Sequence, residues 1–320
     1  MPKINNIGES TPTLIAHPSR EALASDATTR ILDVIEHVLT ERTVAHVSLT
    51  GGTMGIATLH AWAQSPRVKD IDWSRVHFWF SDERFVPERD PDRNDGQAIE
   101  ALLADLVDLG FPVENAHRMG PSDVMIDVEA AAEHYAYEMR NFAGSAEPVR
   151  VEMPEGASEL PLAGGHGGSA SQQSGGGCGC GGCGCGGSDI WPVPIFDVTL
   201  LGMGPDGHIA SLFPNRQQVL LGTGLPEDPV DGAIAVTVMV KDSPKPPSER
   251  VSVTLPVINN SRHIFFLITG GDKQDATTRL LKGAQVPAED ITANMLLETP
   301  AIGARGQKQT LIFATEESLA

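Results

Sequence analysis

The alternation of apolar, strand-like segments with helical segments is the feature that most constrains the fold of this chain. VHFWF (76–80), FDVTLLG (196–202) and HIFFLIT (263–269) are apolar along almost their whole length. Such strands are typical of a sheet buried on both faces, in which the strands run parallel and helices cover each side. Residues 19–41 carry apolar residues at helical spacing, and Ser19 is a suitable N-cap. The pattern predicts an α/β fold with a mainly parallel, Rossmann-like sheet flanked by helices.

The remaining segments extend this pattern along the chain. Further strands are expected at 44–49, 233–238 and 310–315, and further helices at 56–63, 99–106, 127–141, 209–213 and 273–282. Sheets of this class bind ligands at the carboxyl ends of their strands. Loops rich in Gly, Asp or Arg follow three of the predicted strands. We therefore expect these loops to meet at one site.

One stretch interrupts the alternation. Residues 143–190 contain no periodic apolar segment, and residues 164–187 are almost wholly Gly, Ser, Gln and Cys. A loop of this length is unusual inside a compact domain, and it is normally either functional or disordered. We interpret 143–190 as a flexible insertion within a single domain that spans 1–320, and we expect its two ends to lie close together. Because it directly precedes the strand at 196–202, a role as a lid over the site stays open.

The four cysteines all lie in this insertion, in the string CGCGGCGC: Cys178, Cys180, Cys183 and Cys185. Since nothing else in the chain can pair with them, no disulfide framework supports the fold. Their C-x-C-x₂-C-x-C spacing is tighter than that of usual structural zinc sites, and the glycine-rich flanks offer little support for bound metal. We favour an oxidation-prone loop over a metal site.

The charge balance excludes several classes of partner. The chain has 23 basic and 42 acidic residues, which gives a formal net charge of −19. Such a surface repels nucleic acids and anionic membranes, so we expect neither as a partner. A phosphate-bearing ligand would need a local cluster of Arg, Lys or backbone N–H groups. The chain shows neither a run of roughly 20 apolar residues nor the order of a signal peptide, so we expect a cytoplasmic location.

The segment GMGPDGHIASLFP (202–214) carries the strongest chemical signal. Its glycines allow the backbone to approach a ligand closely, and the helix expected after the turn would offer free N–H groups to an anion. Asp206 and His208 lie two positions apart in this turn. A carboxylate beside an imidazole fixes the tautomer that a general base needs. An ordinary Gly-Pro-Asp-Gly turn would have the same sequence, so the spacing alone does not decide the role.

Two other loops support a site. TGGTMG (50–55) lies between a predicted strand and a predicted helix, where glycines and a threonine can bind a phosphate or sugar hydroxyls. SDERFVP (81–87) places three charged residues directly after the strand 76–80. Taken singly, the 50–55 loop could equally be a simple strand–helix connector, and the charged residues of 81–87 could form an ion-pair network on the surface. Together with the 202–214 segment, they favour a binding site.

The motifs SLTGGT, WFSDERFVP with a following RND, LLGMGPDGHIASLFP, PPSERVSVTLPVIN and ITGGDK resemble the 6-phosphogluconolactonases in order and spacing. The resemblance covers most of residues 15–315 apart from the insertion. It implies a sheet of the sugar-phosphate isomerase/deaminase type. It also implies hydrolysis of 6-phospho-D-glucono-1,5-lactone, a small phosphorylated molecule, to 6-phospho-D-gluconate in the oxidative pentose phosphate pathway. A lactone is an ester, so this reaction needs activated water and a stabilised oxyanion but no metal or cofactor.

The resemblance also implies roles for individual residues. His208 resembles the base that activates water, and Asp206 its neighbour. The oxyanion donors are either backbone N–H groups of the Gly202–Gly207 turn or Arg84, and the sequence does not choose between them. The substrate-binding residues implied are Gly51, Gly52, Thr53, Arg84, Asn94, Gly204, Arg250 and Lys273.

Two other functions compete with the hydrolase. A glucosamine-6-phosphate deaminase or isomerase shares the D-G-H turn and an acidic pair after an early strand, here Asp82 and Glu83. Those enzymes carry a glutamate that supports the catalytic histidine, and Phe213 stands at the matching position. The other alternative is a non-catalytic protein that binds sugar phosphates, but such a protein would have no need to keep both Asp206 and His208.

Overall fold

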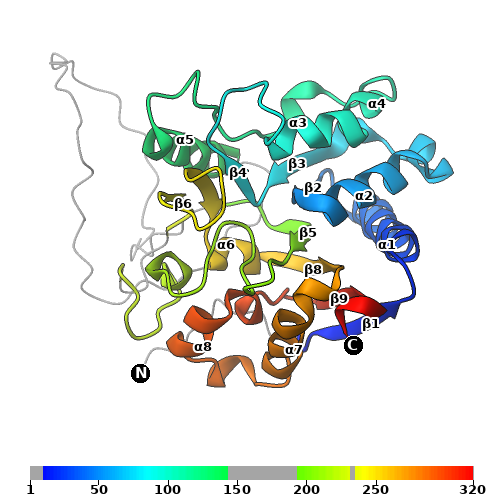
Figure 1. Cartoon of the computed structure of the whole chain (residues 1–320). Helices are drawn as coiled ribbons and strands as arrows, with labels where there is room; N and C mark the ends of the chain where they lie inside the picture. The colour runs from blue at the N-terminus through cyan, green and yellow to red at the C-terminus, as the bar shows by residue number, and fades with distance from the viewer. Residues whose placement is uncertain (1–9, 143–192, 231–234, 320) are drawn as a thin grey trace, which may run out of the picture.

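The computed structural model describes residues 10–142, 193–230 and 235–319, and its centre is a parallel sheet (Figure 1). Within these residues the strand order is β1-β9-β8-β5-β2-β3, and every neighbouring pair is parallel. The prediction of a mainly parallel α/β sheet is thus confirmed. The strands are β1 (Thr13–His17), β2 (Ala45–Leu49), β3 (Val76–Phe80), β5 (Phe196–Gly202), β8 (Ser261–Ile268) and β9 (Gln309–Thr315).

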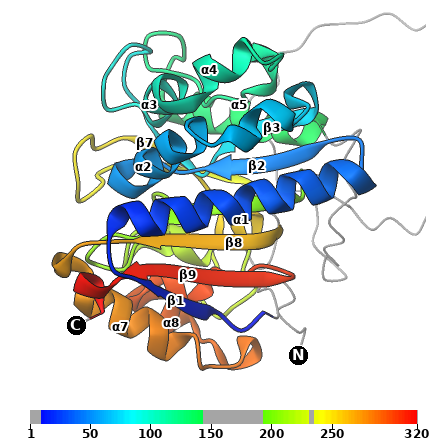
Figure 2. The same cartoon turned by 90° about the vertical axis from the view of Figure 1, so that its right-hand side faces the viewer.

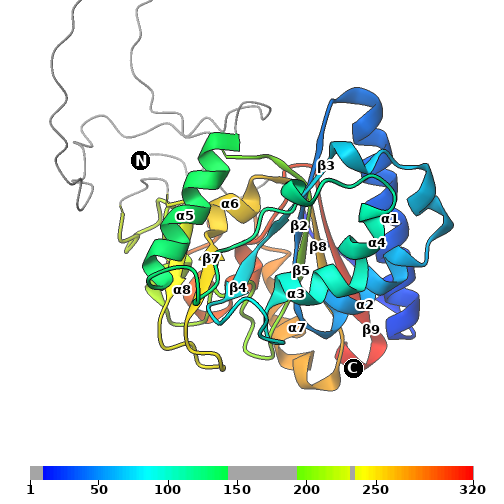
Figure 3. The same ribbon diagram turned by 90° about the horizontal axis from the view of Figure 1, so that it is seen from above.

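Helices cover both faces of this sheet (Figure 3). One layer contains α1 and α2, and α1 lies along the sheet over most of its length (Figure 2). The opposite layer contains α5, α6 and α8. Helix bounds are α1 (Arg20–Glu41), α2 (Gly52–Ala63), α3 (Asn94–Ala98), α4 (Ala104–Val107), α5 (Val128–Asn141), α6 (Leu255–Asn259), α7 (Gln274–Gly283) and α8 (Ala293–Glu298), with a π-helical segment at Ile99–Leu103 between α3 and α4.

Burial on both faces explains the continuous apolar runs. In β3, Phe78 and Phe80 pack into the core beneath α1 and α2, whereas Trp79 between them packs into the core beneath α5. Successive side chains of a strand point to opposite faces, so both sets must be apolar where both faces are covered. At the start of α1, the Ser19 hydroxyl accepts a hydrogen bond from the Ala22 N–H at 3.2 Å, which confirms the predicted N-cap.

A second, antiparallel sheet was not predicted. It contains β4 (Asp82–Arg84), β7 (Arg250–Val253) and β6 (Thr237–Val240), in the order β4-β7-β6. The strand expected at 233–238 belongs to this sheet rather than to the parallel one, and it starts later than expected. β4 is too short and too polar to differ from a loop in sequence, so no local signal marks the sheet.

The prediction of a helix at 209–213 is wrong. The segment forms a tight turn in which the Leu212 N–H donates to the Ile209 carbonyl at 2.9 Å, and Ala210 has a φ of 46°. Long-range contacts override the helical spacing, because the Ser211 hydroxyl donates to Asp82 Oδ2 at 2.7 Å. Pro214 also disfavours helical backbone at the residue before it. No helix N-terminus follows the 202–208 turn.

The insertion predicted at 143–190, with its four cysteines, lies outside the described residues and stays a prediction. On one side of it the Phe142 ring contacts Trp79 at 5.5 Å between ring centroids, and on the other side Phe196 contacts the same ring at 6.2 Å. Phe142 also contacts His77, near the start of β3. These flanking residues therefore lie near the amino-terminal edge of the sheet. No helix in the described ranges is long and apolar enough to cross a membrane.

Three buried histidines lie near that edge, between the sheet and α5. Trp79 Nε1 donates to His46 Nδ1 at 3.1 Å, and His77 Nδ1 lies 3.1 Å from His117 Nε2. His117 Nδ1 bonds to the Glu138 carboxylate at 2.7 Å. Burial, followed by the neighbouring imidazoles, lowers the pKa of His46 to about 3, and burial together with His117 lowers that of His77 to about 4. Both are therefore neutral in the fold.

We predict that His46→Gln makes stability less dependent on pH in the acid range. A histidine with a depressed pKa contributes stability above its unfolded value of about 6.5 and loses it as the pH falls towards the folded value. Between about pH 6 and 4, the free energy of unfolding should therefore fall about 1.4 kcal/mol per pH unit more steeply in the wild type than in the variant. Urea unfolding at several pH values measures these slopes.

The difference in slope between wild type and His46→Gln reports on His46, because the other groups with shifted pKa values are present in both proteins. Glu83, whose pKa burial raises to about 8, acts in the opposite direction but equally in each. The exposed His60 provides the matched control, since His60→Gln should keep the wild-type slope. Equal slopes for His46→Gln and wild type would contradict the prediction.

Candidate active site

The predicted loops meet at the carboxyl edge of the parallel sheet, around a cavity of about 370 Å³. This confirms the expectation that the loops after β2, β3 and β5 converge, and the loop after β8 joins them. Asp206 is not part of the lining but bonds to His208, which is. The predicted residues that line the cavity are Gly51, Gly52, Thr53, Arg84, Asn94, Gly204, His208, Arg250 and Lys273.

The turn after β5 holds Asp206 and His208 together. His208 Nδ1 lies 2.5 Å from Asp206 Oδ1, and the same oxygen accepts the His208 backbone N–H at 3.3 Å. Because a carboxylate only accepts, Nδ1 carries the proton, and the lone pair of the imidazole lies on Nε2. A Cβ at Gly204 would lie 2.1 Å from the His208 ring, so this position requires glycine.

The Asp206 carboxylate stays ionised in this setting. Burial alone would raise its pKa, but the hydrogen bond and the charge of His208 outweigh burial and lower the pKa to about 2. An ionised partner stabilises the imidazolium that forms when His208 takes up a proton. The pair is therefore suited to general-base chemistry.

Arg279 supports the turn from behind. Its Nη2 donates to the Asp206 carbonyl at 3.1 Å, and its Nε donates to the Thr299 hydroxyl at 3.0 Å. The Ala301 N–H donates to the Gly207 carbonyl at 3.1 Å. Gly207 has a φ of 91°, and a Cβ there would lie 2.9 Å from Thr299. The turn that carries Asp206 and His208 is thus fixed by α7 and by the residues that follow α8.

The loop after β2 forms another part of the cavity wall. The strand–loop–helix order is as predicted, but α2 begins at Gly52 and not at residue 56, so its first N–H groups lie at the cavity. A Cβ at Gly51 would lie 1.8 Å from Asn94 Oδ1, so only glycine allows this close approach. The Asn94 oxygen is buried and has no hydrogen-bond partner among the described residues.

Glu83 anchors the segment that carries Asn94. Its carboxylate accepts the backbone N–H groups of Asn94 at 2.7 Å and Asp95 at 2.9 Å. Burial and the Asp95 carboxylate raise the pKa of Glu83, and Arg93, whose Nη2 lies 2.7 Å from Asp95 Oδ2, opposes this shift. The two acidic residues after β3 therefore have different surroundings. Glu83 bonds within this network, whereas Asp82 lines the cavity.

The basic residues of the site differ in how far their donor groups are used in hydrogen bonds within the protein. Arg250 Nε and Nη2 donate to the carbonyls of Lys245, Pro246 and Pro247, so this guanidinium mainly holds the 245–247 loop. Arg84 Nη1 donates to the Asp92 carbonyl at 2.7 Å, whereas its Nε is buried without a partner in the described structure. Burial lowers the pKa of Lys273.

Sequence reasoning assigned no binding role to Lys245 or Asp82, which line the cavity, or to Ser211, which bonds to Asp82. Lys245 lines the cavity, and its place depends on the loop that Arg250 holds. Asp82 lines it too and accepts the Ser211 hydroxyl, which lies far from it in sequence. The charge of Asp82 at a strand end was a usable signal, whereas Lys245 and Ser211 had none.

Fewer backbone N–H groups of the turn after β5 are free to bind an oxyanion than we expected from the sequence. The N–H groups of Gly204 and Gly207 donate to the carbonyls of His208 and Gly204, at 3.0 and 2.9 Å. The Gly202 N–H donates to the Thr50 hydroxyl at 3.4 Å. These glycine donors are thus used inside the protein, which favours Arg84 over them as an oxyanion donor.

Comparison with known proteins assigns the family. Residues 18–160 and 185–300 match the family described as glucosamine-6-phosphate isomerases/6-phosphogluconolactonase. The chain belongs to this family. A 6-phosphogluconolactonase of Streptomyces coelicolor is 37% identical over 303 residues, which cover 94% of this chain and 91% of that protein.

Solved structures of the family share the fold. A 6-phosphogluconolactonase from Trypanosoma brucei matches with a TM-score of 0.66 at 22% identity, covering 96% of this chain and 97% of that one. A monomeric glucosamine-6-phosphate deaminase matches with a TM-score of 0.59 at 14% identity, covering 96% and 100%. Because both enzymes have this fold, the fold alone does not choose between their reactions.

We predict that Arg279→Met loosens the Asp206–His208 pair. Losing two hydrogen bonds from a half-buried guanidinium should cost about 1–2 kcal/mol of stability. The proton on His208 Nδ1 should exchange faster with water, because the turn is no longer held. Proton NMR of the imidazole region and urea unfolding measure the two effects. Arg89→Met, at an exposed arginine, is the control. An unchanged Nδ1 proton signal in Arg279→Met would refute the positioning role.

Proposed function

We propose that this chain hydrolyses 6-phospho-D-glucono-1,5-lactone to 6-phospho-D-gluconate in the oxidative pentose phosphate pathway, with His208 as the general base. The observation that carries the proposal is the Asp206–His208 pair, because His208 lines the same cavity as Arg84, Lys245 and Lys273. The Streptomyces relative, named a 6-phosphogluconolactonase, supports the substrate. In a chain of net charge −19, this local cluster of cations suits a phosphorylated ligand.

The geometry supports a simple sequence of proton transfers. His208 Nε2 takes a proton from a water molecule while the water oxygen forms a bond to the lactone carbonyl carbon. The carbonyl oxygen takes up the negative charge, and the guanidinium of Arg84, which lines the cavity, stabilises it. When the ring C–O bond breaks, its electron pair passes to the ring oxygen, and the His208 imidazolium returns the proton there. Water is added across the ester bond, and no redox partner is needed.

The side chain beside the base argues against a deaminase. The Phe213 ring centroid lies 4.6 Å from that of His208, so an apolar ring occupies the place expected for a supporting glutamate. The ring cannot accept a proton or polarise the imidazole. Asp206 is therefore the one carboxylate bonded to His208 in the described structure.

A non-catalytic sugar-phosphate-binding protein remains the second candidate, because the cations and the Gly51–Gly52 loop would serve binding alone. The Asp206–His208 pair favours catalysis, since phosphate binding does not need a base with a fixed tautomer. A cytoplasmic location stays our expectation for this chain. It is not a family property, because relatives from Arabidopsis and rice are named chloroplastic.

We predict that His208→Gln lowers kcat for the phosphorylated lactone by about 10²–10⁴, the usual contribution of a general base. The substrate must be freshly generated, and the rate must be corrected for spontaneous ring opening. His60→Gln, at an exposed histidine, should keep wild-type activity. If the wild type shows no activity but binds sugar phosphates, the non-catalytic alternative is favoured, and glucosamine 6-phosphate is the next substrate to test.

We further predict that Lys273→Met raises KM for the phosphorylated lactone about tenfold or more, since it removes a charged partner of the phosphate. Activity on the unphosphorylated glucono-1,5-lactone should change little. The matched control is Lys282→Met, at an exposed lysine in the last turn of α7. Equal losses on both lactones would show that Lys273 does not contact the phosphate.

A further inference from the structure

The segment that follows β9 lies beside the loop that carries Lys273. β8 and β9 are parallel neighbours in which Ile268 pairs with Ala314, so both strands end at the same edge of the sheet. The loop 270–273 after β8 and the turn Glu316–Ser318 after β9 therefore lie side by side (Figure 2). No site residue predicted from the sequence lies in this C-terminal turn.

Glu317 bonds to the chain on both sides of Lys273. Before the lysine, the Gly270 N–H donates to Glu317 Oε1 at 3.1 Å. After it, Gln274 Nε2 donates to the Glu317 carbonyl at 3.0 Å. Within the loop, the Lys273 N–H donates to the Gly270 carbonyl at 3.1 Å. The backbone position of Lys273 therefore depends on the contacts that Glu317 makes.

The loop needs this support because it begins with a flexible residue. Gly270 has a φ of 102°, and a Cβ there would lie 2.5 Å from Asp272 Oδ1. Glycine adopts this backbone conformation without steric cost, but it adopts many others as readily. A carboxylate that accepts the Gly270 N–H selects one of them.

Arg20 and Thr269 hold the Glu317 carboxylate in place. The buried Thr269 hydroxyl donates to Glu317 Oε1 at 3.0 Å and accepts a hydrogen bond from Arg20 Nε at 3.1 Å. Arg20 Nη2 lies 3.7 Å from the same carboxylate oxygen, and the two charged side chains are 51% and 52% exposed. Because an ion pair this exposed contributes little, the hydrogen bonds through Thr269 and Gly270 are the important contacts.

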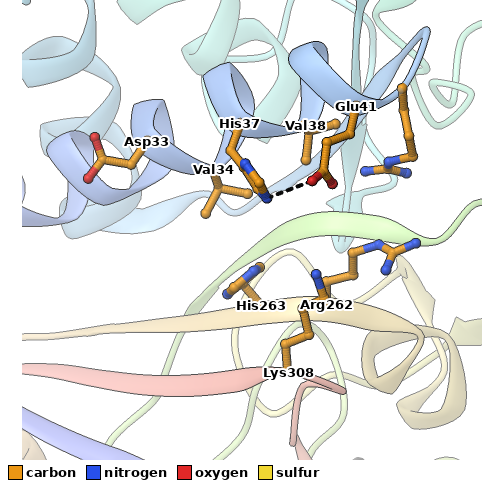
Figure 4. Close-up of a pocket in the computed structure, with 9 residues that line it drawn as sticks. Asp33, Val34, His37, Val38, Glu41, Arg262, His263 and Lys308 are labelled. Atoms are coloured by element: carbon orange, nitrogen blue, oxygen red, sulfur yellow. Dashed lines mark ion pairs between the residues drawn. The ribbon is translucent and has the colours of Figure 1, made fainter.

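Arg20 is the first residue of α1, and the two ends of this helix lie at opposite edges of the sheet. The C-terminal half of α1 lines a separate cavity of about 330 Å³ beside the start of β8 (Figure 4). There Glu41 lies 3.5 Å from His37 Nε2, and its side chain is 62% exposed. Glu41 therefore resembles Glu317 in exposure and in having a basic partner, but it lies away from the candidate active site.

We propose that Glu317 is a positioning residue for substrate recognition, which holds the loop 270–273 so that the Lys273 ammonium meets the substrate phosphate. The proposal rests on the proposed lactonase function, and it concerns binding of the phosphate rather than the proton transfers of His208. Lys273 lines the cavity, whereas Glu317 is not among the described residues that line it, so Glu317 acts through the loop. A lysine that is already in place binds the phosphate without the cost of ordering the loop.

The first test compares KM and kcat of Glu317→Ala on two lactones. KM for 6-phospho-D-glucono-1,5-lactone should rise about threefold to tenfold, the effect of losing one or two hydrogen bonds, and kcat should stay unchanged. Both constants for the unphosphorylated glucono-1,5-lactone should stay unchanged, which also shows that the variant is folded. Glu317→Gln should restore a KM near that of the wild type, because its amide oxygen still accepts the Gly270 N–H.

Two variants control for the loss of an exposed carboxylate. Glu316→Ala removes the neighbouring exposed acid, and Glu41→Ala removes the acid at the other edge of the sheet. Both should keep the wild-type KM. A rise in KM for Glu41→Ala equal to that for Glu317→Ala would indicate a general charge effect and would overturn the proposal. Equal rises on both lactones for Glu317→Ala would do so too.

A double-mutant cycle tests whether Glu317 acts through Lys273. In the Lys273→Met background, Glu317→Ala should add little to KM, because the loop then has no ammonium to position. If the two effects on KM multiply as independent changes, Glu317 does not act through Lys273.

Binding of 6-phospho-D-gluconate, measured by isothermal titration calorimetry, separates this proposal from the proposed reaction. If the wild type hydrolyses neither lactone but binds this ligand about threefold to tenfold more tightly than Glu317→Ala does, the reaction is refuted and the positioning role is supported. Equal binding by the wild type and Glu317→Ala would overturn the positioning role, whatever the activity.

Discussion

The parallel direction of β2, β5 and β8 is the constraint on which the candidate active site depends. Val47 pairs with Val198, and Gly202 pairs with Leu267, so the three strands end at the same edge. The loops that follow them then supply Gly51, His208 and Lys273 to one cavity. An antiparallel neighbour would send one of these loops to the other edge. The site is thus a consequence of strand direction, which buried apolar strands and covering helices impose.

Charge is the second constraint, because an acidic chain must hold several cations in one place. Burial lowers the pKa of Arg250 and Lys273, and Asp82, 4.0 Å from Arg250, partly offsets the cost at that arginine. Buried ions are tolerated where their hydrogen bonds are satisfied. Arg250 meets this condition through backbone carbonyls, and in doing so fixes the loop that brings Lys245 to the site.

The sequence predicted the parts of the fold that local pattern determines. The main strands are visible because a strand buried on both faces is apolar throughout, as in residues 76–80. Asp206 and His208 are visible because both lie in one turn. The segment 209–213 was mispredicted because its apolar spacing is helical, whereas its backbone is fixed by contacts of Ser211 with Asp82 and Ser252. The strands Asp82–Arg84 and Arg250–Val253 pair with each other across a long separation, and no local signal marks such pairing.

Phe213 shows how one side chain can direct this fold towards one reaction. Its ring lies 4.6 Å from His208 and 5.7 Å from the Arg250 guanidinium carbon, between the candidate base and a buried cation. A carboxylate at this position would pair with the guanidinium. It would also stabilise the protonated imidazole, so two acids instead of one would favour the charged form of His208. The phenyl ring instead keeps Asp206 as the single acidic partner. In the proposed reaction, His208 accepts a proton from water and returns it to the leaving oxygen, which is the cycle that ester hydrolysis requires.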